Sequence, residues 1–272
     1  MKVLIAGANG FSALYLKELL AKKDGVELIL SDTRGDLRIC DFTDFSAVLD
    51  LINETCPDQI YNLIGGFSNN YESDYRCNVL PARNIFESIA QAGLKCRVLL
   101  VGSCAEYGKV SETDNPIRES HPLNPISIYG LTKVFQTHLM HYYVLAYGLD
   151  LVMARPFNLM GKGMSSNLFV GHLYEQIKAY QEGRILKIAL GNLESKRDYI
   201  DIIQAVEAYE LIMRCGETGA IYNVGSGYST VMSDLLHKIL AENGLQGKPL
   251  LSIHPENLID MMFPTYSRTS IN

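Results

Sequence analysis

The sequence predicts an α/β fold in which helices flank a doubly wound parallel β-sheet. Short apolar runs of strand length alternate with segments whose apolar residues recur every three to four positions, as in amphipathic helices. The run Arg97–Val101 is continuously apolar after its first residue, which is typical of a strand that a parallel sheet buries on both faces. A chain of 272 residues is long enough for one large domain of this kind with a smaller appended region.

These patterns also predict the order of the elements. Strands are expected at residues 2–6, 26–30, 58–64 and 97–101, and from Leu151, Leu186 and Ile221 onward. Helices are expected after Gly10, at residues 45–52 with Asp44 as N-cap, and at residues 75–92, 127–147 and 231–240. We therefore expect residues 1–155 to form a dinucleotide-binding domain to which later strands return, and residues 156–272 to form mainly a substrate-binding region, shortened at its C-terminus.

Composition excludes several classes of protein. Apolar residues make up 47% of the chain and charged residues 20%, as in ordinary folded proteins, and the net charge of −6 leaves no basic surface for nucleic acid. The six cysteines show no metal-binding or C-x-x-C spacing, so we expect reduced thiols, no metal and a cytoplasmic location. No apolar run approaches the roughly 18 residues of a membrane span, and we expect no membrane partner.

A glycine-rich turn joins the first expected strand to the first expected helix. Gly7 permits a tight turn, Gly10 allows the backbone to approach a ligand closely, and Ala13 is small enough for close packing of helix on strand. Such a turn presents backbone N–H groups and the positive end of a helix dipole to a pyrophosphate. The pattern indicates a Rossmann-type dinucleotide site, with Asn9 and Phe11 as further contacts.

The end of the second strand carries two opposing signals about the cofactor. Asp32 stands where an acid binds the ribose hydroxyls of NAD, whereas Arg34 stands close enough to accept the 2′-phosphate of NADP. The sequence therefore leaves NAD(H) and NADP(H) both open. Asp41 follows a short expected strand, where it could accept a hydrogen bond from the adenine amino group.

Two further turns follow expected strands at the sheet edge where α/β proteins bind ligands. The turn Gly102–Gly108 contains Ser103, Cys104 and Glu106, and the polar loop that starts at Ser68 follows another glycine pair. Polar side chains at these positions are candidates for a substrate cleft.

Tyr129 and Lys133 lie four residues apart in an expected helix, so their side chains share one face. An ammonium beside a phenol stabilises its anion, so we expect the pKa of Tyr129 to fall toward neutrality, which suits proton transfer to or from a substrate oxygen. The alternative is an unrelated pair of side chains on a solvated helix face.

Taken in order, these motifs resemble those of the extended short-chain dehydrogenases/reductases of the NAD-dependent epimerase/dehydratase family. The resemblance covers residues 1 to about 240 and rests on the following set: Gly7-x-x-Gly10, Asp41, Ser103-Cys104-x-Glu106-Tyr107-Gly108, Tyr129-x-x-x-Lys133, Arg155-Pro-Phe-Asn158 with Gly161, and Gly191-Asn-Leu-Glu-Ser-Lys-Arg197-Asp198. Within the family the chain is most similar to the GDP-4-keto-6-deoxy-mannose reductases, whose corresponding turn reads G-S-S-E-E-Y-G.

The resemblance implies roles for the residues of the turn and the helix. Tyr129 would protonate the C4 oxygen of a sugar, and Lys133 would bind the nicotinamide ribose and lower the pKa of Tyr129. Either Ser103 or Cys104 would supply the family's third group, a hydroxyl that bonds the same oxygen; a thiol donates only weakly. Glu106 would stand where the dehydratases carry a general base.

It also implies a substrate and an assembly. Asn158 and Arg197 would hold the diphosphate of a nucleotide sugar, with Arg268 as a further candidate, and Ser68 would line the substrate site. We expect NAD(P)H-dependent reduction of the 4-keto group of a GDP-linked 6-deoxy sugar. A 4,6-dehydratase or epimerase of the same family, and a non-catalytic dinucleotide sensor, are the alternatives. Pairing of the helices at residues 75–92 and 127–147 would give a homodimer.

Overall fold

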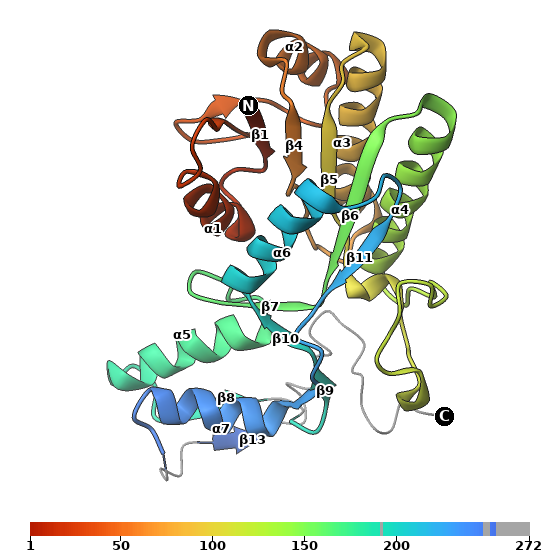
Figure 1. The fold of residues 1–272 in the computed structure, drawn as a ribbon. Helices are drawn as coiled ribbons and strands as arrows, with labels where there is room; N and C mark the ends of the chain where they lie inside the picture. Colours follow the sequence, from red (N-terminus) through yellow and green to blue (C-terminus); the bar gives the residue numbers. More distant parts are fainter. Residues whose placement is uncertain (191–192, 247–250, 254–272) are drawn as a thin grey trace. The chain divides into compact units, whose positions relative to one another are not determined.

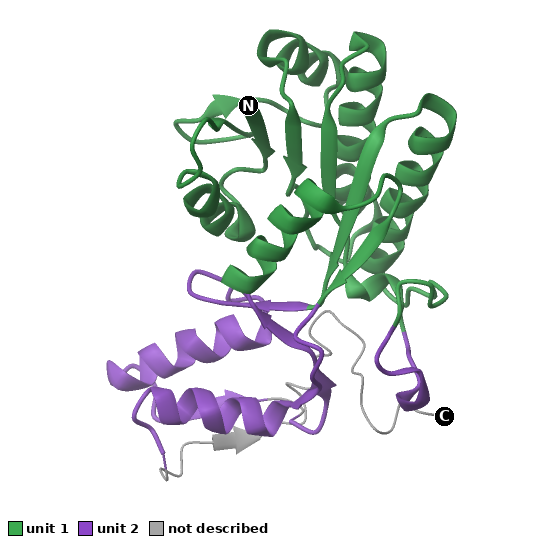
Figure 2. Cartoon of the chain, in the orientation of Figure 1, with its two compact units in different colours: residues 1–108, 118–157, 202–224 green, residues 109–117, 158–201, 225–272 purple. Residues whose placement is uncertain are grey.

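The computed structural model describes residues 1–190, 193–246 and 251–253, and the chain divides into two compact units. Unit 1 comprises residues 1–108, 118–157 and 202–224, whereas unit 2 comprises residues 109–117, 158–201 and 225–272 (Figure 2). Each unit is thus built from segments that are separate in the sequence.

A seven-stranded parallel sheet forms the centre of unit 1, with the order β11-β6-β5-β4-β1-β2-β3 (Figure 1). Its strands are β1 (Lys2–Ala6), β2 (Glu27–Asp32), β3 (Arg38–Ile39), β4 (Gln59–Asn62), β5 (Arg97–Val101), β6 (Asp150–Pro156) and β11 (Ile221–Val224). The order runs outward from β1 in both directions, which places a topological switch point between β1 and β4. The predicted doubly wound parallel sheet is confirmed.

Helices cover both faces of this sheet. On one face α1 (Phe11–Leu20) packs against α6 (Ile202–Cys215); the other face carries α2 (Phe45–Thr55), α3 (Tyr71–Ala92) and α4 (Ile128–Tyr147), with α3 in contact with both of its neighbours (Figure 1). The prediction of an N-cap at Asp44 is confirmed, because its carboxylate accepts a hydrogen bond from the Ser46 N–H. Helix α3 begins four residues before the predicted start because the Asn70 side chain caps it by accepting from the Ser73 N–H.

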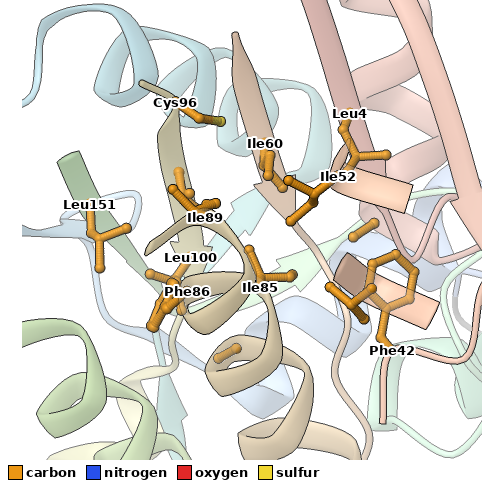
Figure 3. Packing of buried hydrophobic residues seen from close by; sticks show 14 of the residues in the cluster. Leu4, Phe42, Ile52, Ile60, Ile85, Phe86, Ile89, Cys96, Leu100 and Leu151 are labelled. Carbon is orange, nitrogen blue, oxygen red and sulfur yellow. The ribbon is translucent and has the colours of Figure 1, made fainter. Parts of the chain in front are cut away.

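The core on the α3 side is a continuous apolar layer between helix and sheet. Ile85, Phe86 and Ile89 of α3 lie over Ile60 of β4 and Leu100 of β5, and all five side chains are buried (Figure 3). Alternate residues of β1, β5 and β6 point to this layer, so their continuous apolar runs supply both faces of the sheet. This packing fixes the carboxyl ends of the strands, from which the candidate site is built.

The described part of unit 2 contains two α-helices, the 3₁₀ helix η2 (Glu112–Asp114) and three short strand pairs. Apolar side chains of α5 (Phe169–Gln181) and α7 (Met232–Glu242) share one buried cluster. The pairs are β7 (Asn158–Met160) with β10 (Tyr199–Asp201), β8 (Ile188–Leu190) with β13 (Leu251–Ile253), and β9 (Lys196–Arg197) with β12 (Thr230–Val231). Across the described parts of both units, every helix is too short or too polar to cross a membrane.

Candidate active site

The glycine turn between β1 and α1 is closely packed around its backbone. Gly7 adopts a positive φ of 79°, and a Cβ atom there would lie 3.1 Å from Ile64. The N–H groups of Gly7 and Ala8 donate to the Ser31 carbonyl at 3.0 and 3.1 Å. No side chain caps α1 at Gly10, so its first N–H groups remain suited to an anionic ligand.

Asn9 joins this turn to the end of β2. Its backbone N–H donates to Asp32 Oδ2 at 2.9 Å, and its side-chain amide donates to the Arg34 carbonyl at 2.7 Å. Asp32 also accepts from the N–H of Thr33 at 2.7 Å. Both candidate determinants of cofactor choice, Asp32 and Arg34, are therefore held beside the glycine turn.

Asp41 lies just past β3 with its carboxylate held in a local turn. The N–H and the hydroxyl of Thr43 donate to Asp41 Oδ1 at 2.9 and 2.7 Å. These bonds, chiefly that from the hydroxyl, lower the pKa of Asp41, with help from the nearby Arg76. Asp41 is therefore an ionised acceptor at neutral pH.

The turn after β5 is a short 3₁₀ helix, Cys104–Glu106, with Ser103 as its N-cap. The Ser103 Oγ accepts from the Ala105 N–H at 3.2 Å, and Glu106 Oε1 accepts from the Ser103 N–H at 2.9 Å. This reciprocal capping box fixes the backbone of Ser103. Gly102 is required in front of it, because a Cβ there would lie 2.5 Å from Glu106 Oε1.

The first turn of α4 packs directly on this 3₁₀ helix. Gly130 makes the approach close, since a Cβ there would lie 2.5 Å from the Ala105 carbonyl oxygen. The contact brings the Tyr129 side chain into a hydrogen bond with the Ser103 side chain. The ring of Phe67, from the loop after β4, lies 5.7 Å from the Tyr129 ring between centroids.

The pKa of Tyr129 is raised above its ordinary value of 10, opposite to the prediction. Burial of the side chain is the largest cause, and the bond from Ser103 offsets only part of it. The Lys133 Nζ lies 5.7 Å from the centre of the Tyr129 ring. The predicted fall toward neutrality is wrong for this structure, because desolvation outweighs the favourable interactions of the phenolate, and Tyr129 is a neutral acid near pH 7.

Lys133 is nearly fully buried, with 2% of its surface exposed. Its Nζ donates to the Val101 carbonyl and to Gln136 Oε1, both at 3.0 Å. Burial lowers its pKa to about 8, although Glu106 and Cys77 act in the opposite direction. Nζ also borders Gly65 after β4, where a Cβ atom would lie 3.3 Å away.

Asn78 of α3 holds the loop that faces Lys133. Its side chain accepts from the Gly66 N–H at 2.9 Å and donates to the Gly66 carbonyl at 3.0 Å and to Thr132 Oγ1 at 2.9 Å. It is fully buried, so this mid-helix asparagine links the loop after β4 to α4. The sequence did not identify Gln136 as a partner of Lys133. Only its place about one helical turn after Lys133 indicates that the two side chains can meet.

The other residues predicted from the turns are engaged within the protein. Cys104 is buried, and it is the neighbouring Ser103 whose side chain bonds Tyr129. Glu106 is fully buried and both of its oxygens accept internal hydrogen bonds. The N–H and the hydroxyl of Ser68 both donate to Asp74 Oδ1, each at 2.7 Å. These bonds hold the loop after β4 against the first turn of α3.

Two predicted substrate residues belong to unit 2. The Asn158 side-chain amide donates to the Asp198 carbonyl at 2.9 Å, alongside a bond from its backbone N–H at 3.1 Å. Arg197 lies on β9 with 9% of its surface exposed, and its Nη1 donates to the Lys196 carbonyl at 3.1 Å. Arg268 lies outside the described residues. Among the described residues, no cluster of His, Cys, Asp and Glu could hold a metal ion.

Comparison with known proteins decides the family. The model of the NAD dependent epimerase/dehydratase family matches residues 3–225. The chain belongs to this family. The chain is also similar to GDP-6-deoxy-D-mannose reductase of Pseudomonas aeruginosa, with 26% identity over 257 residues, covering 89% of this chain and 79% of the relative. The resemblance inferred from the ordered motifs is thereby confirmed.

Other similar proteins include two that are named as 4,6-dehydratases. GDP-mannose 4,6 dehydratase of Drosophila melanogaster is 26% identical over 253 residues, covering 82% of this chain and 63% of the relative. The structure of RMD from Pseudomonas aeruginosa complexed with NADPH superimposes with a TM-score of 0.84 at 23% identity and covers 93% of this chain and 87% of RMD. The structure of dTDP-glucose 4,6-dehydratase from Bacillus anthracis in complex with NAD superimposes with a TM-score of 0.82 at 18% identity. It covers 93% of this chain and 84% of the dehydratase chain. The predicted nicotinamide dinucleotide is thus confirmed at the level of the family.

Proposed function

We propose that the protein uses NAD(P)H to reduce the 4-keto group of a nucleotide-linked 6-deoxy sugar, with GDP as the favoured nucleotide. The observation that carries this proposal is the meeting of Ser103, Tyr129 and Lys133 at the carboxyl end of β5. The similarity to a GDP-6-deoxy-D-mannose reductase over 89% of the chain supports the sugar and the nucleotide.

The residues around the glycine turn fit the dinucleotide. Gly7 and Gly65 keep their backbone free of side chains at close contacts, because a Cβ at Gly7 would meet Ile64 and one at Gly65 would meet Lys133. The start of α1, which no side chain caps, suits a pyrophosphate. Asp32 or Arg34 would contact the adenosine ribose, with Asp41 at the adenine. When bound, the reduced cofactor supplies the hydride.

The remaining chemistry falls to the side chains of the chain itself. Tyr129, whose pKa burial raises, holds its proton at neutral pH and would deliver it to the C4 oxygen as that oxygen gains negative charge. Ser103 would orient the same oxygen through its hydroxyl. Lys133 would donate from Nζ to the nicotinamide ribose. A neutral phenol is the form that a reductase requires at the start of the reaction.

The environment of Glu106 favours reduction over 4,6-dehydration. Dehydration requires a base that removes a proton next to the keto group. Glu106 is fully buried and hydrogen-bonded through both oxygens, and its neighbour in the turn is Ala105. The described turn Gly102–Gly108 therefore offers no second, free carboxylate for that step.

Asn158 and Arg197 are the side chains that we assign to the sugar-nucleotide diphosphate. Arginine suits this task because its planar guanidinium can bond several phosphate oxygens at once. The low exposure of Arg197 and the two hydrogen bonds that Asn158 donates to the Asp198 carbonyl support preorganised positions for both.

The test is an activity screen of the purified protein. NADPH or NADH would be mixed with GDP-, dTDP- and CDP-linked 4-keto-6-deoxy sugars, and the loss of reduced nicotinamide would be followed by absorbance. We expect consumption matched by appearance of the 4-hydroxy sugar. Absence of consumption with every sugar would overturn the proposal: conversion without net consumption would indicate an epimerase, and dinucleotide binding without conversion would indicate a sensor.

We also propose a homodimer formed through α3 and α4. The outer face of α4 exposes Tyr142, Leu145 and Tyr147, and Tyr71 is exposed near the start of α3. Leu145 is 86% exposed, so this end of α4 presents apolar surface that the described part of unit 1 leaves uncovered.

A further inference from the structure

A fully buried ion pair lies behind the candidate catalytic turn. Arg155 Nη2 of β6 and Glu106 Oε2 lie 2.9 Å apart, and both side chains are 0% exposed. The pair belongs entirely to unit 1. Removing two charges from water is costly, and apolar residues of similar volume are often as stabilising, so stability alone is a weak reason for such a pair.

The pair holds the turn after β5 through both of its members. Glu106 Oε1 accepts from the Ser103 N–H, and Oε2 accepts from the Thr137 hydroxyl at 2.6 Å as well as from Arg155. Arg155 Nη1 in turn donates to the Tyr107 hydroxyl at 2.8 Å, and its guanidinium lies 4.7 Å from the centre of the Tyr107 ring.

The connections reach one helix and two strands of unit 1. Thr137 belongs to α4, two helical turns beyond Tyr129, and Arg155 belongs to β6. Tyr107 passes the connection to β11 by donating to Asn223 Oδ1 at 2.6 Å. Hydrogen bonds thus connect Ser103 to β6, to β11 and to α4, the helix that carries Tyr129.

We propose that Glu106 and Arg155 are positioning residues that hold the Ser103 hydroxyl against Tyr129. They contact neither substrate nor cofactor; Glu106 acts through the Ser103 N–H, and Arg155 acts by holding the Glu106 carboxylate in position through its bond to Oε2. The kinetic part of this inference rests on the proposed reductase function, whereas the geometric part does not.

A double-mutant cycle between Glu106→Gln and Ser103→Ala separates positioning from general loss of structure. The amide of Glu106→Gln keeps the shape of the side chain but turns one of its two acceptors into a donor, which faces either Arg155 Nη2 or the Ser103 N–H. We expect kcat to fall by about 10- to 100-fold, the scale of a small misplacement, with KM nearly unchanged. In the Ser103→Ala background the same change should have little further effect.

The same cycle can be read without a substrate. In protein labelled with isotopic tyrosine, the chemical shift of the Tyr129 ring carbon that bears the hydroxyl reports the bond from Ser103; Tyr129→Phe assigns the signal. We expect Glu106→Gln and Ser103→Ala to move it in the same direction, with no added shift in the double variant. This readout separates failure of the inference from failure of the reductase proposal.

Glu54→Gln, at an exposed glutamate paired with Arg38, should change neither readout. If Glu106→Gln fails to fold, the neutralised pair Glu106→Gln/Arg155→Met takes its place in the cycle. Additive effects in both readouts, or a Glu106 variant with unchanged kcat and an unchanged Tyr129 signal, would overturn the inference.

Discussion

The protonation of Tyr129 is set by its surroundings more than by its nearest cation. Burial disfavours the phenolate and raises the pKa, and the hydrogen bond from Ser103 offsets this only in part. Lys133 is itself desolvated, which lowers its pKa to about 8. Burial therefore raises the pKa of Tyr129 and lowers that of Lys133, and at neutral pH Tyr129 is still a neutral phenol and Lys133 still an ammonium.

The role of Tyr129 as the acid is tested by removing its hydroxyl. Tyr129→Phe should bind the dinucleotide with unchanged affinity and lose turnover by about 10²-fold or more, the scale of lost general acid catalysis. Steady-state kinetics and a fluorescence titration with cofactor measure the two quantities. Tyr142→Phe, at an exposed tyrosine of the same helix, is the matched control. Retained turnover in Tyr129→Phe would remove this residue from the mechanism.

The lowered pKa of Lys133 predicts a pH-dependent affinity for the cofactor. Below pH 8 the side chain is an ammonium that can donate to ribose hydroxyls; as the pH rises through about 8 the charge is lost. The dissociation constant of the dinucleotide should therefore increase with pH across this range while Tyr129 stays protonated. Titrations at a series of pH values measure this. The Lys133→Met variant should bind the dinucleotide weakly, with a dissociation constant that does not change with pH. A dissociation constant of the wild type that does not change with pH would contradict the role of Lys133 at the ribose.

At the scale of elements, the site depends on how closely α4 approaches the 3₁₀ turn Cys104–Glu106. The missing side chain at Gly130 permits this approach, and the Ser127 hydroxyl caps the helix by accepting from the Gly130 N–H at 3.0 Å. The cap fixes the first turn of α4 and with it the direction in which the Tyr129 side chain points.

Gly130→Ala should separate these two elements. The new Cβ would lie 2.5 Å from the Ala105 carbonyl oxygen, so the helix must shift, and we expect kcat to fall at least tenfold and the free energy of unfolding to fall by about 1–3 kcal/mol. Gly148→Ala, at the other end of α4, has open space but a φ of 66°. It should lower stability by about 1 kcal/mol without affecting kcat. Equal kinetics for the two variants, measured beside urea unfolding, would contradict this account.

The sequence was sufficient where local spacing determines the structure. The turn from β1 to α1 and the shared helix face of Tyr129 and Lys133 depend on neighbours within about four residues, and the parallel sheet follows from alternating elements. The environment of Glu106 was not accessible in this way. Its partner Arg155 is 49 residues away, and only tertiary packing brings them together. The pKa of Tyr129 escaped prediction for the same reason, since its burial is a property of the fold.

At the scale of the whole chain, Arg97 ties the returning segment to the sheet. It starts β5, pairs with Asp150 at the start of β6, and donates to the carbonyls of Met213 and Gly216 at the end of α6 at 3.1 and 2.6 Å. The side chain is 19% exposed, so these bonds are partly shielded from water. Residues 202–224 are thereby bonded to the rest of unit 1 at the edge of the sheet opposite the candidate site.

Loss of this anchor should weaken unit 1 and spare its chemistry. We expect Arg97→Met to lower the free energy of unfolding by about 2–4 kcal/mol, because the carbonyls of Met213 and Gly216 lose their charged donor and Asp150 loses its ion pair. Urea unfolding measures this, with cofactor affinity as the check on the site. Arg184→Met, at an exposed ion pair with Glu182, should cost less than about 1 kcal/mol. Similar losses in the two variants would contradict the anchoring role.

The proposed dimer is tested on the exposed face of α4. Leu145→Glu combined with Tyr142→Lys places charges in apolar surface, so it should convert a dimer into monomers. Light scattering after size exclusion measures the mass. Leu186→Glu, at an equally exposed leucine in unit 2, should leave the mass unchanged. A monomeric wild type at micromolar concentration would end the dimer proposal.

The chain passes between the two units five times, after residues 108, 117, 157, 201 and 224. The excursion of residues 158–201 leaves unit 1 just after β6 and returns to it at the start of α6, and both of these elements belong to unit 1. This segment could therefore be lengthened or trimmed to suit a new sugar while the sheet and helices that carry Tyr129 stayed intact. A transplant of residues 158–201 from a relative is accordingly the natural first experiment for anyone wishing to redirect this protein to another ligand.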